Sequence, residues 1–574
     1  MRRRFELALN WSRPALTVGD ALILMALATL LYVGVRLAVR TPTEIAGPTV
    51  SLSPWALPWY ALLSTGRMAA AYLLSLLFTL AYGYAAARNR TAEKILSPLL
   101  DVLQSVPILS FLPVVLLGLT AILPQGFAVE LSSIILIVTS QAWNMAFSFY
   151  QSLITIPVEM REASSIFRLN SWLRFKTMEL PFAAPALIWN SMMSWAGGWF
   201  FLMAAETFTV GNRDLRLPGL GSYLQAAANA GDLRSILLGI GVLVLIITLM
   251  DQFVWRSILA WADKFKVEMV GSDDAPESWF YDMLSRSWLL EKFNQRIRHP
   301  LTERVDASMV RAFGPTVTPV ERAPEERTSR TVIVAGLVAL AVLIYGGIRA
   351  ATLLASVPGE QWVRIGEGAL ATLLRVTFSL VIAAAWTIPV GVAIGTNRKL
   401  AAVLQPIVQI VASVPATALF PVMLMVLINM AGGLNIAAII LMLMGTQWYV
   451  LFNVIAGASA IPQDLNYTTA LLQVKGWERW RTLILPALFP YLITGMITAG
   501  GGAWNASIVA EYVRFGGTTH ATMGIGALIS EATASGNYAL LLAATLTLIL
   551  AVISINRLFW RRLYQVAEDK YRME

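Results

Sequence analysis

Four ionisable residues lie inside strongly apolar stretches, at equivalent places in the two halves of the chain. Arg67 and Arg375 stand near the starts of two such stretches, and Glu206 and Glu511 stand near the ends of two others. Ionisable side chains in an apolar environment are costly, so they either pair with one another or serve a function. We expect one Glu–Arg pair in each half, with direct contact to a solute as the alternative role of these residues.

Other kinds of chemistry find little support in the sequence. The chain has no cysteine and two histidines, so thiolate chemistry is excluded and a metal site is not expected. It contains no Gly-x-x-x-x-Gly-Lys-Ser/Thr loop to cradle nucleotide phosphates. No nucleophile arrangement or carboxylate dyad stands out either. We therefore expect that the chain is not an enzyme and carries no cofactor of its own.

The elements that must hold the four residues are membrane-spanning helices. Of the 574 residues, 57% are hydrophobic and 13% are charged, which does not fit a soluble globular protein. Runs long enough to cross roughly 30 Å of hydrocarbon recur about twelve times. They cover 20–40, 60–87, 98–120, 128–152, 182–206, 235–260, 331–356, 368–395, 402–430, 434–458, 487–512 and 538–560. The fold class predicted is an all-α polytopic membrane protein.

The placement of the positive charge predicts the orientation of these spans. The formal net charge is +9, but the lysines and arginines gather in alternate loops rather than in a nucleic-acid-binding patch. Loops rich in Lys and Arg stay on the cytoplasmic side. They hold Arg88, Arg90, Lys94, Arg161, Arg168, Arg174, Lys176, Arg398, Lys399, Lys475, Arg479 and Arg481, whereas 121–130 and 430–435 hold none. Both termini are expected in the cytoplasm, and the first span is expected to be retained because no cleavage pattern follows Arg4.

The chain repeats itself. Equivalent residues align in register across the halves, as in Arg67/Arg375, Gly83/Gly391, Pro107/Pro415, Trp172/Trp477, Leu180-Pro181/Leu485-Pro486, Trp199/Trp504 and Glu206/Glu511. Shared apolar composition would not align prolines, tryptophans and glutamates. We predict a tandem duplication, with repeats at 1–262 and 331–574 joined by a polar linker at 263–330. Six spans in each repeat give both the same orientation, and the pathway is expected at their interface.

The linker contains SWFYDMLSRSWLLEKF, which places apolar residues between charges. Trp279, Phe280, Trp288, Leu289 and Leu290 are its apolar members. The segment could be an amphipathic helix on the membrane surface or against a partner. A short helix packed on its own linker is an equal alternative.

A charged stretch, PVEMREASSIFRLNSWLRFKTMELP, separates the fourth and fifth spans. Pro157 can begin a helix, and Glu159 and Glu162 fall in its first turns, where negative charge favours the helix dipole. Met160, Ala163, Ile166 and Phe167 recur at helical spacing and predict one apolar face. The stretch is expected to form a short cytoplasmic helix parallel to the membrane.

This stretch resembles a motif of a known family. Glu162-Ala163-Ser164, followed after a fixed interval by Leu180-Pro181, resembles the cytoplasmic EAA loop of permease subunits of type I ATP-binding-cassette importers. The segments 97–113, 405–421, 199–207 and 504–512, with PGLGSYL and MGIGALI, are similar to the nitrate/sulfonate/taurine branch. The resemblance covers most of both repeats. It implies two parallel six-helix repeats of the type I importer permease fold.

In that family the loop helix inserts into a cleft on an ATPase subunit and transmits its closure. The resemblance assigns this role to two loops, near 157–181 and 462–486. Their coupling residues would be Glu159, Glu162, Ala163, Ser164, Arg168, Leu180 and Pro181, and Asp464, Tyr467, Thr468, Thr469, Gln473, Leu485 and Pro486. Arg168 and Gln473 replace the family's glycine, and Tyr467-Thr468-Thr469 replaces Glu-Ala-Ala. The two loops are therefore expected to couple unequally.

The resemblance implies partners as well. Two ATPase subunits, which would hold ATP and Mg, are expected on the cytoplasmic side of a bacterial inner membrane, and a periplasmic or extracellular binding protein on the other. No nucleic acid is expected. The GLG and GIG sequences at 219–221 and 524–526 have little steric bulk. From the residues alone they are flexible external loops, and the resemblance places the binding protein near them.

The leading hypothesis is the fused permease of an ATP-driven importer for a small solute, such as an anion of the nitrate, sulfonate or taurine kind. Pathway candidates are Arg67, Trp195, Trp199, Glu206, Arg375, Trp504, Asn505 and Glu511. The aromatic residues among them could equally pack or anchor helices. An ion-coupled secondary transporter is the alternative, although such proteins usually need buried titratable groups for the coupling ion.

Overall fold

The computed structural model describes residues 18–38, 47–104, 106–210, 213–265, 278–287, 292, 295–296, 299–313, 330–461, 463–515 and 518–571. This part of the chain is helical except for loops and two short antiparallel hairpins. The hairpins pair β1 (Thr209–Val210) with β2 (Arg213–Asp214) and β3 (Tyr512–Phe515) with β4 (Thr518–Ala521). The predicted all-α class holds, with these hairpins as an addition.

The first repeat runs from α1 to α11. Its helices are α1 (Val18–Ala38), α2 (Leu57–Arg88), α3 (Arg90–Leu103), α4 (Leu112–Thr120), α5 (Gln125–Ile154), α6 (Val158–Ile166), α7 (Ser171–Arg174), α8 (Leu180–Glu206), α9 (Leu220–Asn229), α10 (Leu233–Leu249) and α11 (Arg256–Asp263). The linker contributes α12 (Trp279–Ser285) and α14 (His299–Phe313).

The second repeat follows the same order. Its helices are α15 (Arg330–Ala355), α16 (Gly359–Thr396), α17 (Arg398–Ser413), α18 (Ala416–Leu427), α19 (Gly433–Ser459), α20 (Gln463–Leu471), α21 (Gly476–Arg479), α22 (Leu485–Ala510), α23 (Ile525–Ser535), α24 (Tyr538–Ile555) and α25 (Arg561–Tyr571). Even the π-helical turns recur, at Phe175–Glu179 and Trp480–Ile484 and at Met250–Trp255 and Asn556–Trp560. The two halves of the sequence therefore fold into equivalent series of elements.

Seven helical stretches of the described chain are long and apolar enough to cross a membrane. Shorter apolar helices at Ala21–Leu37, Ile108–Thr120, Leu340–Ala355 and Ala416–Leu427 and the 27-residue α8 account for the other expected spans. Two predicted spans, 98–120 and 402–430, are wrong as continuous helices. Pro107 and Pro415 stand where each is broken, and both have extended backbone. Proline cannot donate an intrahelical hydrogen bond, so α3 and α17 end before it and a new helix begins after it.

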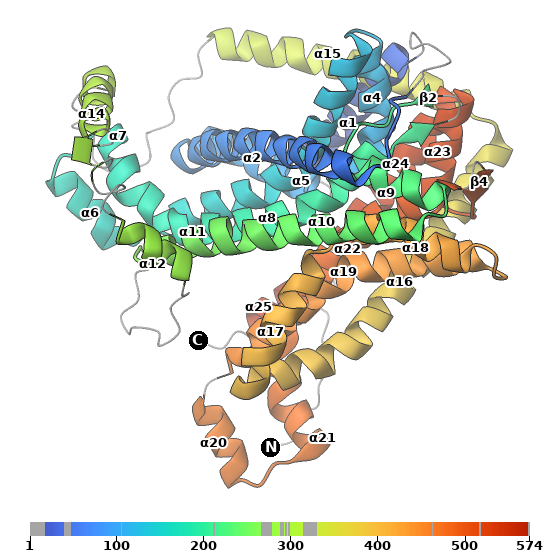
Figure 1. Cartoon of the computed structure of the whole chain (residues 1–574). Coiled ribbons are helices and arrows are strands. Elements are labelled where there is room, and N and C mark those ends of the chain that lie inside the picture. Colours follow the sequence, from blue (N-terminus) through green and yellow to red (C-terminus); the bar gives the residue numbers. More distant parts are fainter. Residues whose placement is uncertain are drawn as a thin grey trace.

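The two repeats diverge at one end and meet at the other. In each repeat three long helices pack side by side: α2, α5 and α8 in the first, and α16, α19 and α22 in the second. Figure 1 shows α6 and α7 at the far end of the first bundle and α20 and α21 at the far end of the second. The hairpins, α9 and α23 lie at the opposite end. Contacts between repeats include α1 with α15, where the Thr29 hydroxyl donates to the Leu343 carbonyl over 3.1 Å.

The two charged loops that the sequence predicts to be cytoplasmic follow α5 and α19. We name residues 157–181 the first cytoplasmic module and residues 463–486 the second. Both short helices end in a residue with left-handed backbone, Arg168 (φ 50°) and Gln473 (φ 54°), the only such non-glycine residues in the described chain. The Leu169 N–H donates to the Ser164 carbonyl over 3.1 Å, and the Val474 N–H donates to the Thr469 carbonyl over 2.9 Å. This bonding pattern is a Schellman cap, which explains why glycine suits the position.

Part of the linker packs on the first repeat. The Phe253 ring meets Trp279 and Phe280 edge-on, with ring centroids 5.7 and 4.9 Å apart. Ser257 and Ser278 share a hydrogen bond of 3.2 Å. The short helix predicted near Trp279 is therefore α12, packed on the turn between α10 and α11. Trp288, Leu289 and Leu290 lie outside the described residues.

The strained cap of the first module predicts the effect of restoring glycine. A left-handed non-glycine residue costs about 1–2 kcal/mol, partly offset by the greater unfolded-state entropy of glycine. Arg168→Gly should therefore slow amide hydrogen exchange at residues 163–169 about fivefold. Hydrogen exchange with mass spectrometry on the detergent-solubilised protein measures this.

Arg168→Ala is the matched control, because it removes the same side chain but keeps the Cβ atom that causes the strain. Equal exchange rates in the two variants would contradict the assignment of strain to this residue.

Candidate translocation pathway and docking surfaces

A buried ion pair joins three helices of the first repeat at the end opposite the cytoplasmic module. Arg67 on α2 donates to Glu206 at the end of α8 over 2.8 Å and binds Glu130 on α5 through two hydrogen bonds of 2.6 Å. The Glu206 side chain is fully buried. It also accepts hydrogen bonds from the Ser64 hydroxyl at 2.7 Å and the Gly221 N–H at 2.7 Å. The carboxylate therefore sits at the N-terminus of α9, where the helix dipole favours negative charge.

The second repeat builds the same arrangement from equivalent residues. Arg375 donates to the fully buried Glu511 over 2.7 Å. The Thr372 hydroxyl and the Gly526 N–H donate to the same carboxylate over 2.7 and 2.9 Å. Asn435 stands where the first repeat has Glu130 and accepts from Arg375 at 2.7 Å. The structure thus pairs the charges within each repeat, as the sequence predicts.

The GLG and GIG sequences are parts of these networks rather than flexible loops, so that expectation was wrong. Gly219 and Gly524 precede α9 and α23, and a Cβ atom at either position would overlap the carboxylate of Glu206 or Glu511. Gly221 and Gly526 begin the helices and donate their N–H groups to the same carboxylates. Only glycine allows the backbone to approach a buried side chain this closely.

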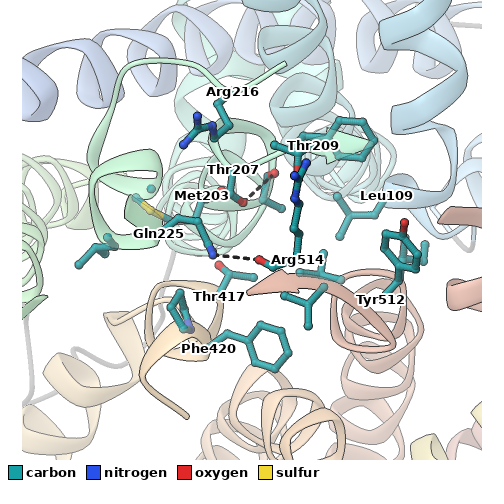
Figure 2. A pocket seen from close by; sticks show the side chains of 18 of the residues that line it. Leu109, Met203, Thr207, Thr209, Arg216, Gln225, Thr417, Phe420, Tyr512 and Arg514 are labelled. Carbon is teal, nitrogen blue, oxygen red and sulfur yellow. Dashed lines mark hydrogen bonds between the residues drawn. The ribbon is translucent and has the colours of Figure 1, made fainter. Parts of the chain in front are cut away.

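An outward cavity of about 360 Å³ lies between the two repeats. Figure 2 shows Arg216, Thr207 and Gln225 from the first repeat facing Arg514 and Tyr512 from the second. Gln225 donates to the Arg514 carbonyl over 3.3 Å, which joins the repeats across the cavity. Arg216 is paired with Asp214 at 2.5 Å. The cavity is thus lined by cationic and neutral hydrogen-bond donors together with the Asp214 carboxylate, which Arg216 neutralises.

A second cavity, of about 550 Å³, lies between the repeats on the side of the cytoplasmic modules. We call it the inward cavity, after the orientation that the sequence predicts. Its walls are strongly aromatic, with Trp189, Trp195, Trp199, Phe200, Trp255, Trp448 and Tyr449 among the lining residues. Polar groups come from Asp251, Gln405, Gln409, Asn453 and Asn505. Asp251 pairs with Arg256 at 3.0 Å, so its charge is balanced within the first repeat.

Two hydrogen bonds between the repeats lie where the cavities meet. The Leu109 N–H donates to Asn505 Oδ1 over 3.1 Å, and the Thr417 hydroxyl donates to the Phe200 carbonyl over 3.2 Å. Leu109 and Thr417 line the outward cavity, whereas Phe200 and Asn505 line the inward one. Leu109 is equivalent to Thr417 and Phe200 to Asn505, so the two bonds are related by the repeat. We call these four residues the partition.

The predicted pathway residues divide into two groups. Trp195, Trp199 and Asn505 line the inward cavity. Trp504 is buried among core residues and lines neither cavity. Arg67, Glu206, Arg375 and Glu511 also lie away from both cavities, in the networks described above. Asn505 of the partition was predicted as a pathway residue. Sequence reasoning missed Arg216, Arg514 and the other three partition residues, because at these positions the repeats carry different residue types and comparing the halves gives no match.

The cytoplasmic modules expose apolar side chains at equivalent positions. Ile166 and Phe167 are 78% and 75% exposed, and their equivalents Leu471 and Leu472 are 85% and 67% exposed. The predicted apolar face of the first helix is therefore split: Met160 packs inward, while Ile166 and Phe167 point away from the protein. Such exposed apolar residues typically mark a surface that another protein covers.

The other predicted coupling residues occupy these same modules. Glu159, Glu162 and Arg168 are exposed, as are Asp464, Tyr467, Thr468 and Gln473. Ala163 and Thr469 are half-buried, and Ser164 is buried, where it donates to the Arg161 carbonyl over 2.7 Å. Leu180-Pro181 and Leu485-Pro486 begin α8 and α22. Among the described residues, no group of three or more His, Asp or Glu side chains could hold a metal ion.

The glycines against the buried carboxylates give a direct test of the networks. Gly219→Ala and Gly524→Ala should each lower the free energy of unfolding by about 1–3 kcal/mol, because the new methyl group displaces a buried carboxylate from its donors. Thermal unfolding in detergent, followed by intrinsic fluorescence, measures the change.

Gly126→Ala is the control, since a Cβ atom there meets nothing within 4 Å. A melting temperature for Gly219→Ala as high as that of Gly126→Ala would contradict the close packing.

Comparison with known proteins agrees with this arrangement. The model of the family described as "Binding-protein-dependent transport system inner membrane component" matches residues 75–255 and again 387–563. The bicarbonate transport system permease protein CmpB of Synechococcus elongatus is 34% identical over 163 residues, which are 28% of this chain and 55% of the relative. The nitrate import permease protein NrtB of the same species is 30% identical over 172 residues, 30% of this chain and 58% of the relative.

A third relative is more distant. The taurine transport system permease protein TauC of Escherichia coli is 27% identical over 163 residues, 28% of this chain and 55% of the relative. The chain thus spans little more than half the length of the curated relatives it matches. The two separate family matches coincide with the two structural repeats. The chain therefore belongs to the family of binding-protein-dependent transport system inner membrane components and contains that family's domain twice.

Proposed function

We propose that this chain is the fused permease of an ATP-driven importer and forms the translocation pathway for a small anion across a bacterial inner membrane. The relatives named above are permeases for bicarbonate, nitrate and taurine. In this proposal both repeats contribute to one pathway, and each repeat carries one ATPase-docking surface. A soluble binding protein delivers the solute at the end formed by the hairpins, α9 and α23.

The observation that carries the proposal is the pair of exposed apolar surfaces on the cytoplasmic modules. Ile166 and Phe167 are matched by Leu471 and Leu472, and all four side chains are exposed. A short helix with projecting apolar residues suits insertion into a groove on a partner. Two such helices at equivalent positions suit two ATPase subunits, which would supply ATP and Mg. Closure of these subunits would then move α8 and α22, which follow the modules directly.

The cavities support a pathway between the repeats. One opens on each side of the partition, and both are lined by residues from the two repeats. Arg514 and the neighbouring hydroxyl and amide groups can donate hydrogen bonds to an anion entering the outward cavity, whereas Arg216 is engaged by Asp214. A relative rotation of the repeats would break the two partition bonds and join the cavities.

An ion-coupled mechanism is less well supported. Its coupling ion would need a carboxylate that exchanges partners during transport. Glu206 and Glu511 each accept from an arginine, a hydroxyl and a helix N-terminus, so they are fully engaged in holding α9 and α23.

The docking surfaces predict the stoichiometry of ATPase binding. Phe167→Asp would bury an unpaired charge in the partner's groove and should weaken docking on the first module about a hundredfold. Leu472→Asp is the equivalent change in the second module, with a smaller effect expected from its divergent motif. Each single variant should bind one ATPase subunit per chain, and the double variant none, as measured by native mass spectrometry.

The isolated chain should hydrolyse no ATP in the same assay series. Met283→Asp on α12 is the control, because Met283 is an exposed apolar residue outside both modules. Two bound subunits in the double variant would overturn the assignment of these surfaces.

The partition predicts a leak when its bonds are removed. Thr417→Val together with Asn505→Leu removes both bonds between the repeats, each worth about 1 kcal/mol. Passive nitrate flux through proteoliposomes without ATP should rise several-fold, because the closed partition is destabilised relative to the open one. Thr498→Val is the control, since Thr498 is exposed and donates only within its own helix. Equal flux in both variants would show that the partition does not separate the cavities.

A further inference from the structure

The linker helix α14 lies against the first cytoplasmic module. It contacts α7, and Figure 1 shows it beside α7 at the end of the first repeat. Among the described linker elements, α12 packs on α11 and α14 packs on α7. The linker therefore does more than connect the repeats.

The Asp306 carboxylate of α14 makes the polar contacts with this module. The Trp172 indole N–H donates to Asp306 Oδ1 over 2.9 Å, and Lys176 forms an ion pair with Asp306 Oδ2. Trp172 belongs to α7 and Lys176 to the π-helical turn that follows, so Asp306 holds two successive segments. The Lys176 and Asp306 side chains are 34% and 26% exposed, which leaves the pair partly shielded from salt. Hydrogen bonds to an ionised group are stronger than neutral ones.

The second module has the same residue types without the same contact. Trp477 is equivalent to Trp172 but is 72% exposed, and Arg481 is equivalent to Lys176. The last helix of the second repeat, α25, is equivalent to α11 and packs on α22 as α11 packs on α8, so it does not correspond to α14. A further ion pair holds the first module: Arg88 at the end of α2 binds Glu179 over 2.9 Å. The equivalent positions of the second repeat hold Thr396 and Ile484, which cannot form an ion pair. Among the described residues, the contacts of Asp306 and Glu179 in the first module thus have no equivalent in the second.

We propose that α14 is a brace for the first cytoplasmic module, with Asp306 as the positioning residue, and that the two modules therefore transmit ATPase closure unequally. The brace is a contact within this chain, whereas its effect on coupling rests on the proposed function. Because α14 holds the first module in place, movement of the docked ATPase subunit is transmitted directly to α8. In the second module Trp477 is exposed rather than held by a helix such as α14, so this module can absorb part of the movement before α22 responds.

The brace is built to persist under ordinary conditions. Lys176 and then the Trp172 indole hold the pKa of Asp306 below its usual range. A carboxyl group with a lowered pKa contributes stability above its unfolded pKa of about 4 and loses it as the pH falls through the lower folded value. The contact is therefore expected to stay intact at neutral pH.

Zero-length cross-linking tests where α14 sits, because a carbodiimide joins a lysine amine to a carboxylate by an amide bond only where the two groups are in contact. Lys176 and Asp306 form an ion pair, so they should cross-link in the full-length protein. Arg481→Lys places a lysine at the equivalent position of the second module, and this lysine should not cross-link to Asp306. A yield at 176 no higher than at 481 would overturn the placement of the brace.

Hydrogen exchange tests whether the contact holds the module. Asp306→Asn removes the ion pair, and exchange of the backbone amides of residues 158–176 should rise about tenfold or more, with residues 463–481 unchanged. Glu303→Gln removes a similar charge from the same helix but lies 70% exposed beside His299, so it should leave both modules unchanged. No change in Asp306→Asn, or an equal change in both modules, would overturn the proposal.

Transport then tests the consequence. In proteoliposomes with the ATPase and binding-protein partners and nitrate as the probe, Asp306→Asn should lower the nitrate moved per ATP by about half, with Glu303→Gln at the unmodified ratio. An unchanged ratio would overturn the unequal coupling. The cross-linking and hydrogen-exchange experiments need neither ATP nor solute. They therefore test the contact between α14 and the first module even if the proposed transport function is wrong.

Discussion

The outer end of each repeat depends on one buried charge. Glu206 and Glu511 lie in the apolar interior, where an ionised carboxylate is stable only if every oxygen has a donor. An arginine, a hydroxyl and the N-terminus of a helix supply those donors in both repeats. The same contacts fix α2 and α16 against the ends of α8 and α22, and α9 and α23 against both. Breaking such a pair typically costs about 3–5 kcal/mol, so the position of each outer helix is strongly determined.

The duplication preserves backbone geometry while the side chains diverge. The partition is an example. The backbone N–H of Leu109 donates to the Asn505 side chain in one bond, whereas the Thr417 side chain donates to the backbone carbonyl of Phe200 in the equivalent bond. Glu130 and Asn435 differ in charge yet both bind the arginine of their repeat. The left-handed caps at Arg168 and Gln473 are present in both repeats although neither residue is glycine. The two repeats therefore share backbone positions while their side chains differ. Because the side chains can differ, one module can have a brace that the other lacks among the described residues.

Much of the architecture could be predicted from periodicity and from residues that recur in both halves. The duplication, most of the spans and the Arg67–Glu206 and Arg375–Glu511 pairs follow from patterns that a single chain displays. The helix breaks at Pro107 and Pro415 could not be predicted in the same way, because apolar residues continue on both sides of each proline and the pattern resembles one continuous span. The sequence predicts flexible loops at GLG and GIG, because glycine is typical both of flexible backbone and of backbone packed closely against another group. Only the position of the neighbouring carboxylate in the structure shows that these glycines are of the second kind.

The sequence by itself determined the class of the protein, its internal repeat and its two cytoplasmic modules, because hydrophobicity, charge placement and motif spacing are properties of the chain. Only the tertiary structure decided which residues line the cavities, how the partition is bonded and where Asp306 binds. These depend on contacts between residues far apart in the chain, such as Leu109 with Asn505 and Trp172 with Asp306. Residue type shows that such groups can donate or accept a hydrogen bond, but packing decides which partner each one meets.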